Sequence, residues 1–409
     1  DSNIALLLSV GESRHDAYRR MLEVLRRTTI SGRGLATNLE FHYGLLHWFL
    51  GRTVHAHPTT GFILPYLTAV AELRQRTNDI DLVLTYQQLG DVLLAQVPEA
   101  GRAALRSTLE RKYSLLRRPL EKLLNGPHLL SGWLSANRDC YALVDGKINW
   151  RRNPLELLAD TYNFLDMNYR QGRPAAEIIW DHDNELLQSG LAFYAELKRR
   201  LDLQDWGKCQ ILLAGEKAPR GFNGRLWKQV RAAHAGFQSG LDILAVIPFI
   251  AETTGFYELD INDDLTINIP ERLLNEELQQ RMTRVLAPPP VSGANEILAE
   301  SGGMFYPRES PEHEVFVQRG SHFETGDPLY IVEVMKMFNK VHARFSGTVD
   351  EVLVEGEGVI ISKGQPLYRI TPDEAPVEEP AEDLRHRRQG FSEEFLAFRY
   401  GGKPDDYSA

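Results

Sequence analysis

The spacing of apolar residues predicts a mainly helical domain over residues 76–290. Apolar residues recur there at three- and four-residue intervals, which is the spacing along one face of a helix. The clearest runs are Leu105, Leu109, Leu116, Leu120 and Leu124, and then Leu187, Leu191, Tyr194, Leu197 and Leu201. Pro119 lies within the first run. Because proline lacks the backbone N–H that a helix interior needs, we expect it to kink this helix or to end the segment before it.

Residues 1–75 are predicted to form a small α/β region ahead of the helical domain. Asn3–Val10 is an apolar run that predicts a buried strand, and Glu12–Arg27 has the periodicity of an amphipathic helix. The first residue is Asp1 rather than methionine, and the predicted strand begins almost at once. We therefore expect the chain to be part of a longer polypeptide.

Short apolar runs separated by glycines predict a small all-β domain over residues 296–371. The sequence GDPLY at residues 326–330 returns as GQPLY at residues 364–368, an offset of 38 residues. Gly320 and Gly358 match at the same offset. An internal repeat of this kind predicts that the domain consists of two related β halves.

The first β half contains six more residues than the second. The segment 299–303 matches the segment 343–347 at an offset of 44 residues rather than 38. The six extra residues therefore lie between Gly303 and Gly320. We assign them to the polar stretch 307–314, which we expect to protrude as a loop.

Two related β halves packed around a pseudo-twofold axis predict a flattened barrel. The junction between the halves is Glu333–Met337, and a tight hairpin there would lift Lys336 off the surface. The prolines at 288–290 and the acidic, proline-rich residues 371–382 are predicted to be linkers on either side of the domain. The pattern predicts a tethered arm that presents one lysine.

The motif Glu333–Met337 (EVMKM) resembles the attachment motif of biotin carrier domains in biotin-dependent carboxylases, and residues 299–370 resemble the whole domain. The resemblance implies that a biotin ligase attaches biotin to Lys336. It also implies that the flanking side chains shape recognition by the ligase, namely those of Glu333, Val334, Met335 and Met337. The inserted residues 307–315 resemble the thumb of carriers from bacterial-type acetyl-CoA carboxylases. Val334, where alanine is more frequent, resembles the large single-chain acetyl-CoA carboxylases.

Residues 1–75 resemble the C-terminal end of a biotin carboxylase. The motifs behind this resemblance are Asp1-x-x-Ile4-Ala5, Gly11-Glu12-x-Arg14, Ala17-x-x-Arg20-Met21, Thr37-Asn38-Leu39 and Thr60-Gly61-Phe62-Ile63. The resemblance implies that ATP, magnesium and bicarbonate bind at a carboxylase site outside this chain, which alone lacks a complete active site. By its position, the helical domain 76–290 is expected to contact a carboxyltransferase. Residues 372–409 are expected to be an acidic linker and the start of a following region.

Composition narrows the function classes further. The formal net charge of −10 argues against a protein that binds nucleic acid through an overall positive charge. The longest apolar run, Leu241–Ala251, contains a proline and is too short to span a membrane. Cys140 and Cys209 lie far apart, so neither a disulfide framework nor a cysteine-based metal site is predicted. We expect a cytoplasmic protein, because two cysteines that form no disulfide are typical of a reducing compartment.

Two polar clusters have simpler interpretations than catalysis or metal binding. Asp181–Glu185 opens a helical pattern, and acidic residues are favoured at the start of a helix. Asp260, Asn262 and Asp264 resemble positions of a calcium loop, but Leu265 occupies the place of the glycine that makes its sharp turn. We therefore predict a hairpin over residues 257–269 and no metal site.

These observations predict a multidomain α+β chain with a small α/β remnant, a mainly helical middle domain and an all-β, flattened-barrel carrier domain. We interpret it as the biotin carrier and inter-domain scaffold of an acyl-CoA carboxylase in fatty acid metabolism. The resemblance implies that biotin on Lys336 shuttles carboxylate from an ATP-dependent biotin carboxylase to a carboxyltransferase that carboxylates an acyl-CoA. It also implies a large homo-oligomer.

Three alternatives stay open. The chain could be the carrier part of a pyruvate, 2-oxo-acid or urea carboxylase, or a carrier-like interaction scaffold that is never modified. It could also contain a lipoyl domain, which shares the fold and the presented lysine. Lipoyl hairpins typically have aspartate before the lysine and lack methionines on both sides, so Met335 and Met337 favour biotin.

Overall fold

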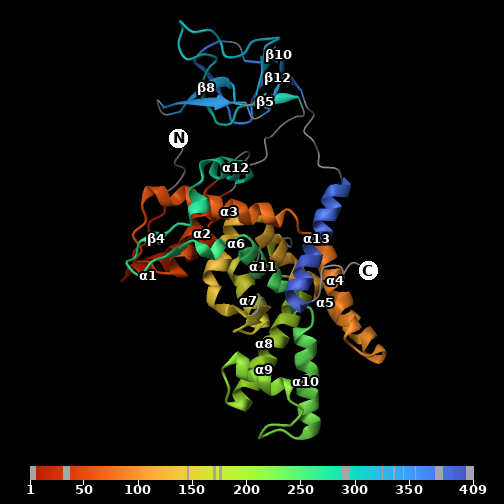
Figure 1. Ribbon diagram of the computed structural model, residues 1–409. Helices are drawn as coiled ribbons and strands as arrows, with labels where there is room; N and C mark the ends of the chain where they lie inside the picture. Colours follow the sequence, from red (N-terminus) through yellow and green to blue (C-terminus); the bar gives the residue numbers. More distant parts are fainter. Residues whose placement is uncertain are drawn as a thin grey trace. The chain divides into compact units, whose positions relative to one another are not determined.

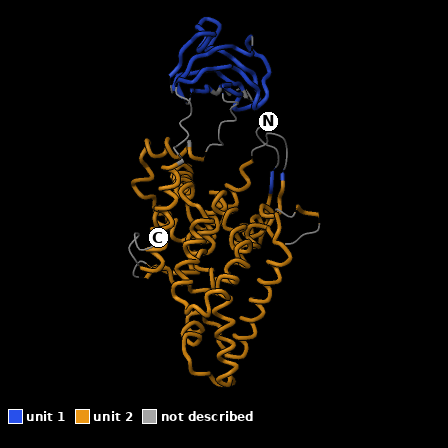
Figure 2. The backbone as a smooth tube through the Cα atoms, turned by 90° about the vertical axis from the view of Figure 1, so that its right-hand side faces the viewer, with its two compact units in different colours: residues 1–7, 30–36, 287–381 blue, residues 8–29, 37–286, 382–409 orange. Residues whose placement is uncertain are grey.

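The chain folds into two compact units, which Figure 2 distinguishes by colour. The β unit comprises residues 1–7, 30–36 and 287–381, and the helical unit comprises residues 8–29, 37–286 and 382–409. The computed structural model describes residues 6–30, 37–144, 147–168, 172–174, 177–286, 295–324, 326–334, 337–343, 345–354, 356–373 and 381–401.

The helical unit is built mainly from α-helices (Figure 1). Its helices are α1 (Arg14–Arg27), α2 (Leu39–Leu50), α3 (Ile63–Thr77), α4 (Leu82–Ala95), α5 (Glu99–Asn125), α6 (Pro127–Ala136), α7 (Pro154–Phe164), α8 (Asp181–Leu201), α9 (Trp206–Ala214), α10 (Gly224–Gln238), α11 (Val246–Thr253), α12 (Glu276–Leu286) and α13 (Ala381–Tyr400). Two short antiparallel ribbons accompany them, β1 (Tyr141–Val144) with β2 (Lys147–Trp150) and β3 (Asp260–Ile261) with β4 (Ile267–Asn268). The predictions of a helical middle region and of a hairpin within residues 257–269 are confirmed.

Pro119 lies inside α5 and does not end it, because a tyrosine replaces the hydrogen bond that proline cannot make. The helix continues from Glu99 to Asn125. Proline lacks an N–H, so the carbonyl of Leu115, four residues earlier, has no helical partner at this position. The hydroxyl of Tyr162 on α7 donates to that carbonyl oxygen at 2.8 Å. Both Tyr162 and Leu115 are buried, so this bond satisfies a carbonyl that water does not reach.

The strand predicted at Asn3–Val10 is wrong for the residues that the structure describes. Residues 6–10 have no strand structure, and residues 1–5 lie outside the described residues. The side chains of Leu6, Leu8 and Val10 are 82%, 81% and 82% exposed. A strand needs a partner, and none of the described strands pairs with this segment. The helix after it is confirmed as α1, with the Ser13 side chain accepting a hydrogen bond from the backbone N–H of Asp16 at its N-terminus.

The helices before and after residue 75 pack into one unit, so the boundary expected there does not separate two compact bodies. Helices α2 and α6 approach each other closely. A Cβ atom added to Gly44 would lie 2.5 Å from the carbonyl oxygen of His128, and one added to Gly132 would lie 3.1 Å from the Cα of Gly44. Glycine is required at such a crossing because a side chain would hold the backbones apart.

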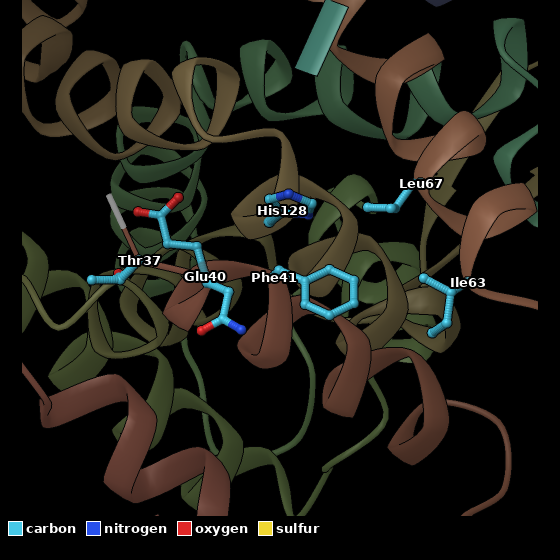
Figure 3. Close-up of a pocket in the computed structure, with 7 residues that line it drawn as sticks. Thr37, Glu40, Phe41, Ile63, Leu67 and His128 are labelled. Carbon is cyan, nitrogen blue, oxygen red and sulfur yellow. The ribbon is translucent and has the colours of Figure 1, made fainter. Parts of the chain in front are cut away.

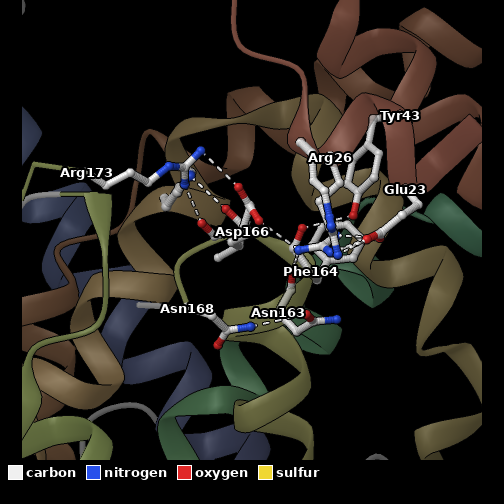
Figure 4. A network of polar contacts seen from close by, with 11 residues as sticks. Glu23, Arg26, Tyr43, Asn163, Phe164, Asp166, Asn168 and Arg173 are labelled. Atoms are coloured by element: carbon white, nitrogen blue, oxygen red, sulfur yellow. Dashed lines mark hydrogen bonds and ion pairs between the residues drawn. The ribbon is translucent and has the colours of Figure 1, made fainter. Parts of the chain in front are cut away.

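A buried ion-pair network also joins α1 to the segment after α7 (Figure 4). Arg26 Nη1 lies 2.8 Å from Asp166 Oδ1, and Arg173 Nη2 lies 2.9 Å from Asp166 Oδ2. The Asp166 side chain is 5% exposed. Nearby, the Tyr43 hydroxyl donates to the carbonyl oxygen of Phe164 at 2.9 Å. Two guanidinium groups on one carboxylate offset the cost of burying its charge, and the network fixes α1 and α2 against α7.

Helix α13 completes the helical unit, whereas the sequence predicted that residues 372–409 form an acidic linker and the start of a following region. Its aromatic residues surround Phe249 of α11, with ring centroids 5.6, 5.7 and 4.9 Å away for Phe391, Phe395 and Phe398. The hydroxyls of Ser392 and Thr85 lie 2.7 Å apart at the buried contact with α4. The residues that α13 meets lie more than 100 positions earlier in the chain, so the local sequence gives no sign of these contacts.

The β unit contains two four-stranded antiparallel sheets, in the orders β5-β12-β10-β7 and β11-β6-β8-β9. The strands are β5 (Glu296–Leu298), β6 (Gly303–Tyr306), β7 (His322–Phe323), β8 (Pro328–Val334), β9 (Met337–His342), β10 (Gly347–Val352), β11 (Val359–Ile361) and β12 (Pro366–Pro372). Their inward-facing residues form one core that includes Phe305, Tyr330, Val332, Leu367 and Tyr368. The flattened barrel stays a prediction, because the described strands pair as two separate sheets.

The internal repeat is confirmed by two equivalent hydrogen bonds that link the two β halves. The N–H of Gly326 donates to the carbonyl of Ala343 at 2.8 Å, and the N–H of Gly364 donates to the carbonyl of Ala299 at 2.8 Å. Each bond therefore joins one half to the other, and the two bonds are related by the repeat. Gly326 and Gly364 have φ angles of 100° and 80°, which only glycine adopts readily. The repeat also converts each sheet order into the other, as a pseudo-twofold axis requires.

Among the described residues, no single helix has both the length and the apolar character needed to cross a membrane. Helix α10 together with the segment Leu241–Thr253 reaches that threshold only as a bent pair. The second member of this pair is core: Ile243, Ala245 and Ile247 are each at most 1% exposed.

We predict that Tyr162→Phe lowers the free energy of unfolding of the helical unit by about 1–2 kcal/mol, because it leaves the buried Leu115 carbonyl without a partner. In a Pro119→Ala background the same change should cost less, since the N–H of residue 119 can then donate to that carbonyl. Urea denaturation of the two single variants and the double variant measures the coupling. Equal costs of Tyr162→Phe in both backgrounds would contradict this account of the helix.

Candidate functional site

Strands β8 and β9 pair on either side of the predicted attachment residues. The strands pair in antiparallel register, with Glu333 opposite Phe338 and Val334 opposite Met337. Residues 335 and 336 connect this last pair, so Met335 and Lys336 occupy the turn in the chain order, although they lie outside the described residues. For Val334 and Met337 the structure describes the backbone alone. The tight hairpin expected at the junction of the two halves is therefore present up to the residues that flank the turn.

Glu333 is held in place by a tyrosine on the neighbouring strand. The hydroxyl of Tyr306 on β6 donates to Glu333 Oε2 at 2.8 Å, and both residues are half-buried. This hydrogen bond to the carboxylate raises the pKa of Tyr306. The contact anchors the end of β8, next to the turn, to the adjacent strand. The sequence motif marked Glu333 but not Tyr306, which lies 27 residues earlier.

The inserted loop, residues 307–315, is attached to the β unit on two sides. Arg308 forms an ion pair with Glu357, and Glu309 forms one with Lys340 on β9. The hydrogen bond from Lys340 lowers the pKa of Glu309. The backbone N–H of Phe316 donates to the Pro307 carbonyl at 2.9 Å, so the two ends of the loop lie side by side.

A cavity of about 390 Å³ lies between the inserted loop and the second β half. Its walls are mainly aliphatic, and the lining residues include Val315, Val317, Val352, Val354 and Tyr368. Arg308 and Glu357, which pair with each other, also line it. The loop therefore covers an apolar recess rather than lying flat on the sheet.

A second cavity, of about 620 Å³, lies in the helical unit at the start of α2 (Figure 3). Its lining residues are Thr37, Asn38, Glu40, Phe41, Ile63, Leu67 and His128. Thr37, Asn38 and Ile63 come from two of the five motifs that resemble a biotin carboxylase, so these two motifs lie at one cavity. Burial lowers the pKa of His128 to about 4. Burial also raises the pKa of Glu40, an effect that the nearby Lys122 opposes.

A serine, a histidine and an aspartate meet where α8 begins. The Ser114 hydroxyl lies 2.8 Å from each carboxylate oxygen of Asp183, and His182 Nε2 lies 3.1 Å from Asp183 Oδ1. A nucleophilic triad needs the histidine between the other two, with one ring nitrogen on each. Here the serine donates directly to the carboxylate, so the cluster joins α8 to α5 and is not a triad. In the described part of the chain, no group of three or more histidine, cysteine or acidic residues could hold a metal ion.

Residues 302–370 match the family model described as "Biotin-requiring enzyme". This segment is a biotinyl/lipoyl domain. It spans the two β halves, both sides of the β8–β9 turn and the inserted loop. The recognition of a carrier-type domain from the EVMKM motif is confirmed.

Among curated proteins, the biotinyl/lipoyl domain is similar to biotin carboxyl carrier proteins of acetyl-CoA carboxylase. The protein from Pseudomonas aeruginosa is 40% identical over 84 residues, which cover 20% of this chain and 53% of that protein. The protein from Nostoc sp. is 38% identical over 78 residues, covering 19% of this chain and 42% of that protein. The chain thus spans about half the length of the curated relatives that it matches.

A solved structure titled as a single-chain, multi-domain long-chain acyl-CoA carboxylase also matches, at 22% identity and a TM-score of 0.17. The match covers 30% of this chain and 11% of that one. A likeness of this size carries no argument about the arrangement of the helical unit.

We predict that replacing residues 307–315 with a Gly-Gly linker leaves the biotinyl/lipoyl domain folded. The second β half lacks this insertion, the ends of the loop are already adjacent, and the two surface ion pairs contribute at most about 1 kcal/mol each. Thermal unfolding should stay cooperative, and the transition of the helical unit serves as the internal reference. Loss of cooperative unfolding would show that the loop is a structural part of the core.

We predict that buried His128 makes the helical unit less stable as the pH falls. Its pKa is about 4 when folded and near 6.5 when unfolded, so between these values the unfolded state binds a proton that the folded state does not. The contribution of His128 to the free energy of unfolding should therefore fall by up to about 1.4 kcal/mol per pH unit through this window. Burial also lowers the pKa of His47 to about 3 and that of His234 to about 4, so these two histidines add slopes of their own. His128→Gln should reduce the total slope by the share of one histidine, which urea midpoints at pH 7, 6 and 5 would measure. Parallel pH profiles for the two proteins would contradict the assignment.

Proposed function

We propose that this chain carries biotin on Lys336 and serves as the carrier and scaffold part of an acyl-CoA carboxylase. The observation that carries the proposal is the β8–β9 turn: residues 335 and 336 connect a tightly paired hairpin inside a biotinyl/lipoyl domain. Similarity to carrier proteins of acetyl-CoA carboxylase supports biotin over lipoate and an acyl-CoA over other acceptors.

The residues of the hairpin fit covalent attachment. The strand pairing ends at Val334 and Met337, and Lys336 lies between these two residues in the sequence. The ligase would form an amide between Lys336 Nζ and the carboxyl carbon of biotin, while ATP, cleaved to AMP and pyrophosphate, accepts the carboxylate oxygen that leaves. When bound, biotin carries a carboxyl group from one active site to another. The tether makes that transfer intramolecular and so replaces diffusion with a high local concentration.

The remaining parts of the chain take their proposed roles from their order. Residues 1–75 would be the end of a biotin carboxylase, whose ATP, magnesium and bicarbonate bind outside this chain, and residues 76–290 would contact a carboxyltransferase that carboxylates the acyl-CoA. Residues 372–380 would link the carrier domain to α13. The single helical unit supports a scaffold role, because it joins the proposed carboxylase end to the helices that the carboxyltransferase would contact. We further propose a cytoplasmic, oligomeric enzyme of fatty acid metabolism.

The molecule that accepts the carboxyl group distinguishes an acyl-CoA carboxylase from pyruvate and urea carboxylases. A complete enzyme containing this chain would be tested with acetyl-CoA, a longer acyl-CoA, pyruvate and urea under identical conditions. Carboxylation of an acyl-CoA alone supports the proposal. Carboxylation of pyruvate or urea instead would keep the carrier and replace the acceptor.

We predict that Lys336→Arg abolishes carboxylation of the acyl-CoA by the complete enzyme, because arginine keeps the charge but offers no amine for amide formation. Carboxylation of free biotin by the same enzyme should continue, since that reaction does not need the tether. Lys363→Arg is the matched control: an exposed lysine of the same domain undergoes the same substitution. Overall activity retained by the Lys336→Arg enzyme would refute the carrier role.

A further inference from the structure

The segment formed by α9 and α10 is strongly basic, although the chain as a whole has a formal net charge of −10. Residues 206–238, from the start of α9 to the end of α10, contain six basic residues and one acidic residue, Glu216. Asp205, just before α9, accepts a hydrogen bond from the backbone N–H of Lys208 and so caps that helix. We call residues 206–238 the basic end. Its basic residues are Lys208, Lys217, Arg220, Arg225, Lys228 and Arg231.

The charges of the basic end are not balanced within the molecule. None of its six basic residues forms an ion pair with another described residue, and five of them are exposed. The last turn of α8, directly before this segment, differs: Lys198 pairs with Glu156, and Arg199 pairs with Glu196. Because like charges repel one another, an unpaired basic cluster fits a negatively charged partner.

A second region of the helical unit has the opposite charge. Residues 252–286, from the end of α11 to the end of α12, contain eight acidic and three basic residues. The formal charges of the two regions are therefore opposite in sign and equal in size. We call residues 252–286 the acidic end. Its exposed acidic residues that form no ion pair with a described residue are Glu252, Asp263, Asp264, Glu271, Glu276 and Glu277.

The basic and acidic ends lie at opposite ends of the helical unit. Figure 1 shows α9 and α10 at one end and β4 and α12 towards the other, with α6 and α7 between them. A helix with its side chains is about 10 Å thick, which exceeds the screening distance of about 8 Å at physiological ionic strength. The two ends therefore do not neutralise each other within one copy.

Each end also carries one strongly exposed aliphatic side chain. Ile211 on α9 is 77% exposed, and Leu274, just before α12, is 53% exposed. Protein interfaces combine apolar side chains at their centre with polar and charged side chains at their rim. Both ends thus have the composition of one side of a protein interface, with opposite charges.

We propose that the basic end of one copy of this chain binds the acidic end of a second copy, in a head-to-tail contact between helical units. A second copy is the partner for which the structure itself supplies the complement, since it offers unpaired charges of the opposite sign. The contact uses two different surfaces, so it builds a ring if the geometry closes and an open chain of copies if it does not. This inference goes beyond the proposed function, because it concerns the helical unit and does not depend on biotin.

The test measures self-association of the full chain by sedimentation velocity over a range of protein concentrations, in about 0.05 M and about 0.5 M salt. The variant Arg225→Glu/Lys228→Glu reverses charges at the basic end, and Glu271→Lys/Glu277→Lys reverses them at the acidic end. All four residues are exposed, so thermal unfolding should stay cooperative. We expect each variant alone, and the wild type in high salt, to associate at least about tenfold more weakly than the wild type in low salt.

An equimolar mixture of the two variants tests the head-to-tail arrangement itself. The unaltered acidic end of the first variant matches the unaltered basic end of the second, and the two reversed ends also match each other. The mixture should therefore associate about as tightly as the wild type. Binding of a different acidic protein at the basic end would give no such rescue.

The matched control is Arg106→Glu/Arg111→Glu on α5, where two exposed arginines without an ion pair to a described residue undergo the same change in net charge. Its self-association should stay within about twofold of the wild type. A monomeric wild type, an equal loss in the control, or a mixture that does not associate would overturn the contact. None of these results bears on Lys336, whose modification is measured separately by mass.

Discussion

The antiparallel pairing of β8 with β9 is the constraint on which the rest of the account depends. It places Val334 opposite Met337 and leaves two residues to connect the strands. The pairing is itself held by the exchange of strands between the two β halves, because β8 and β9 come from different halves of the repeat and lie in one sheet. A hairpin anchored in this way holds Val334 and Met337, the residues on either side of the proposed attachment segment, at a defined place in the sheet.

The helical unit has a different organisation, in which contacts between distant segments replace local repetition. Asp166 binds Arg26 and Arg173, and Phe249 meets three phenylalanines of α13. These contacts make a single body out of the chain before the carrier and a helix after it. A single body of this kind supports the scaffold role that we propose for the helical unit.

The sequence predicted the structure best where the pattern of residues was local or occurred twice in the chain. The glycines at 326 and 364 and the motif around Lys336 indicated two β halves and a hairpin, because a repeat constrains both copies at once. It predicted least where a segment depends on a distant partner. An apolar run at residues 3–10 suggested a strand that has no partner strand among the described residues, and Pro119 suggested a break that a hydrogen bond from Tyr162 compensates.

The most direct test of the central claim is the intact mass of this chain after co-expression with a biotin ligase, combined with peptide mapping. The account predicts one added biotin per chain, located on the peptide that contains Lys336. A chain that stays unmodified in the presence of an active ligase, or that carries biotin on another lysine, would contradict it.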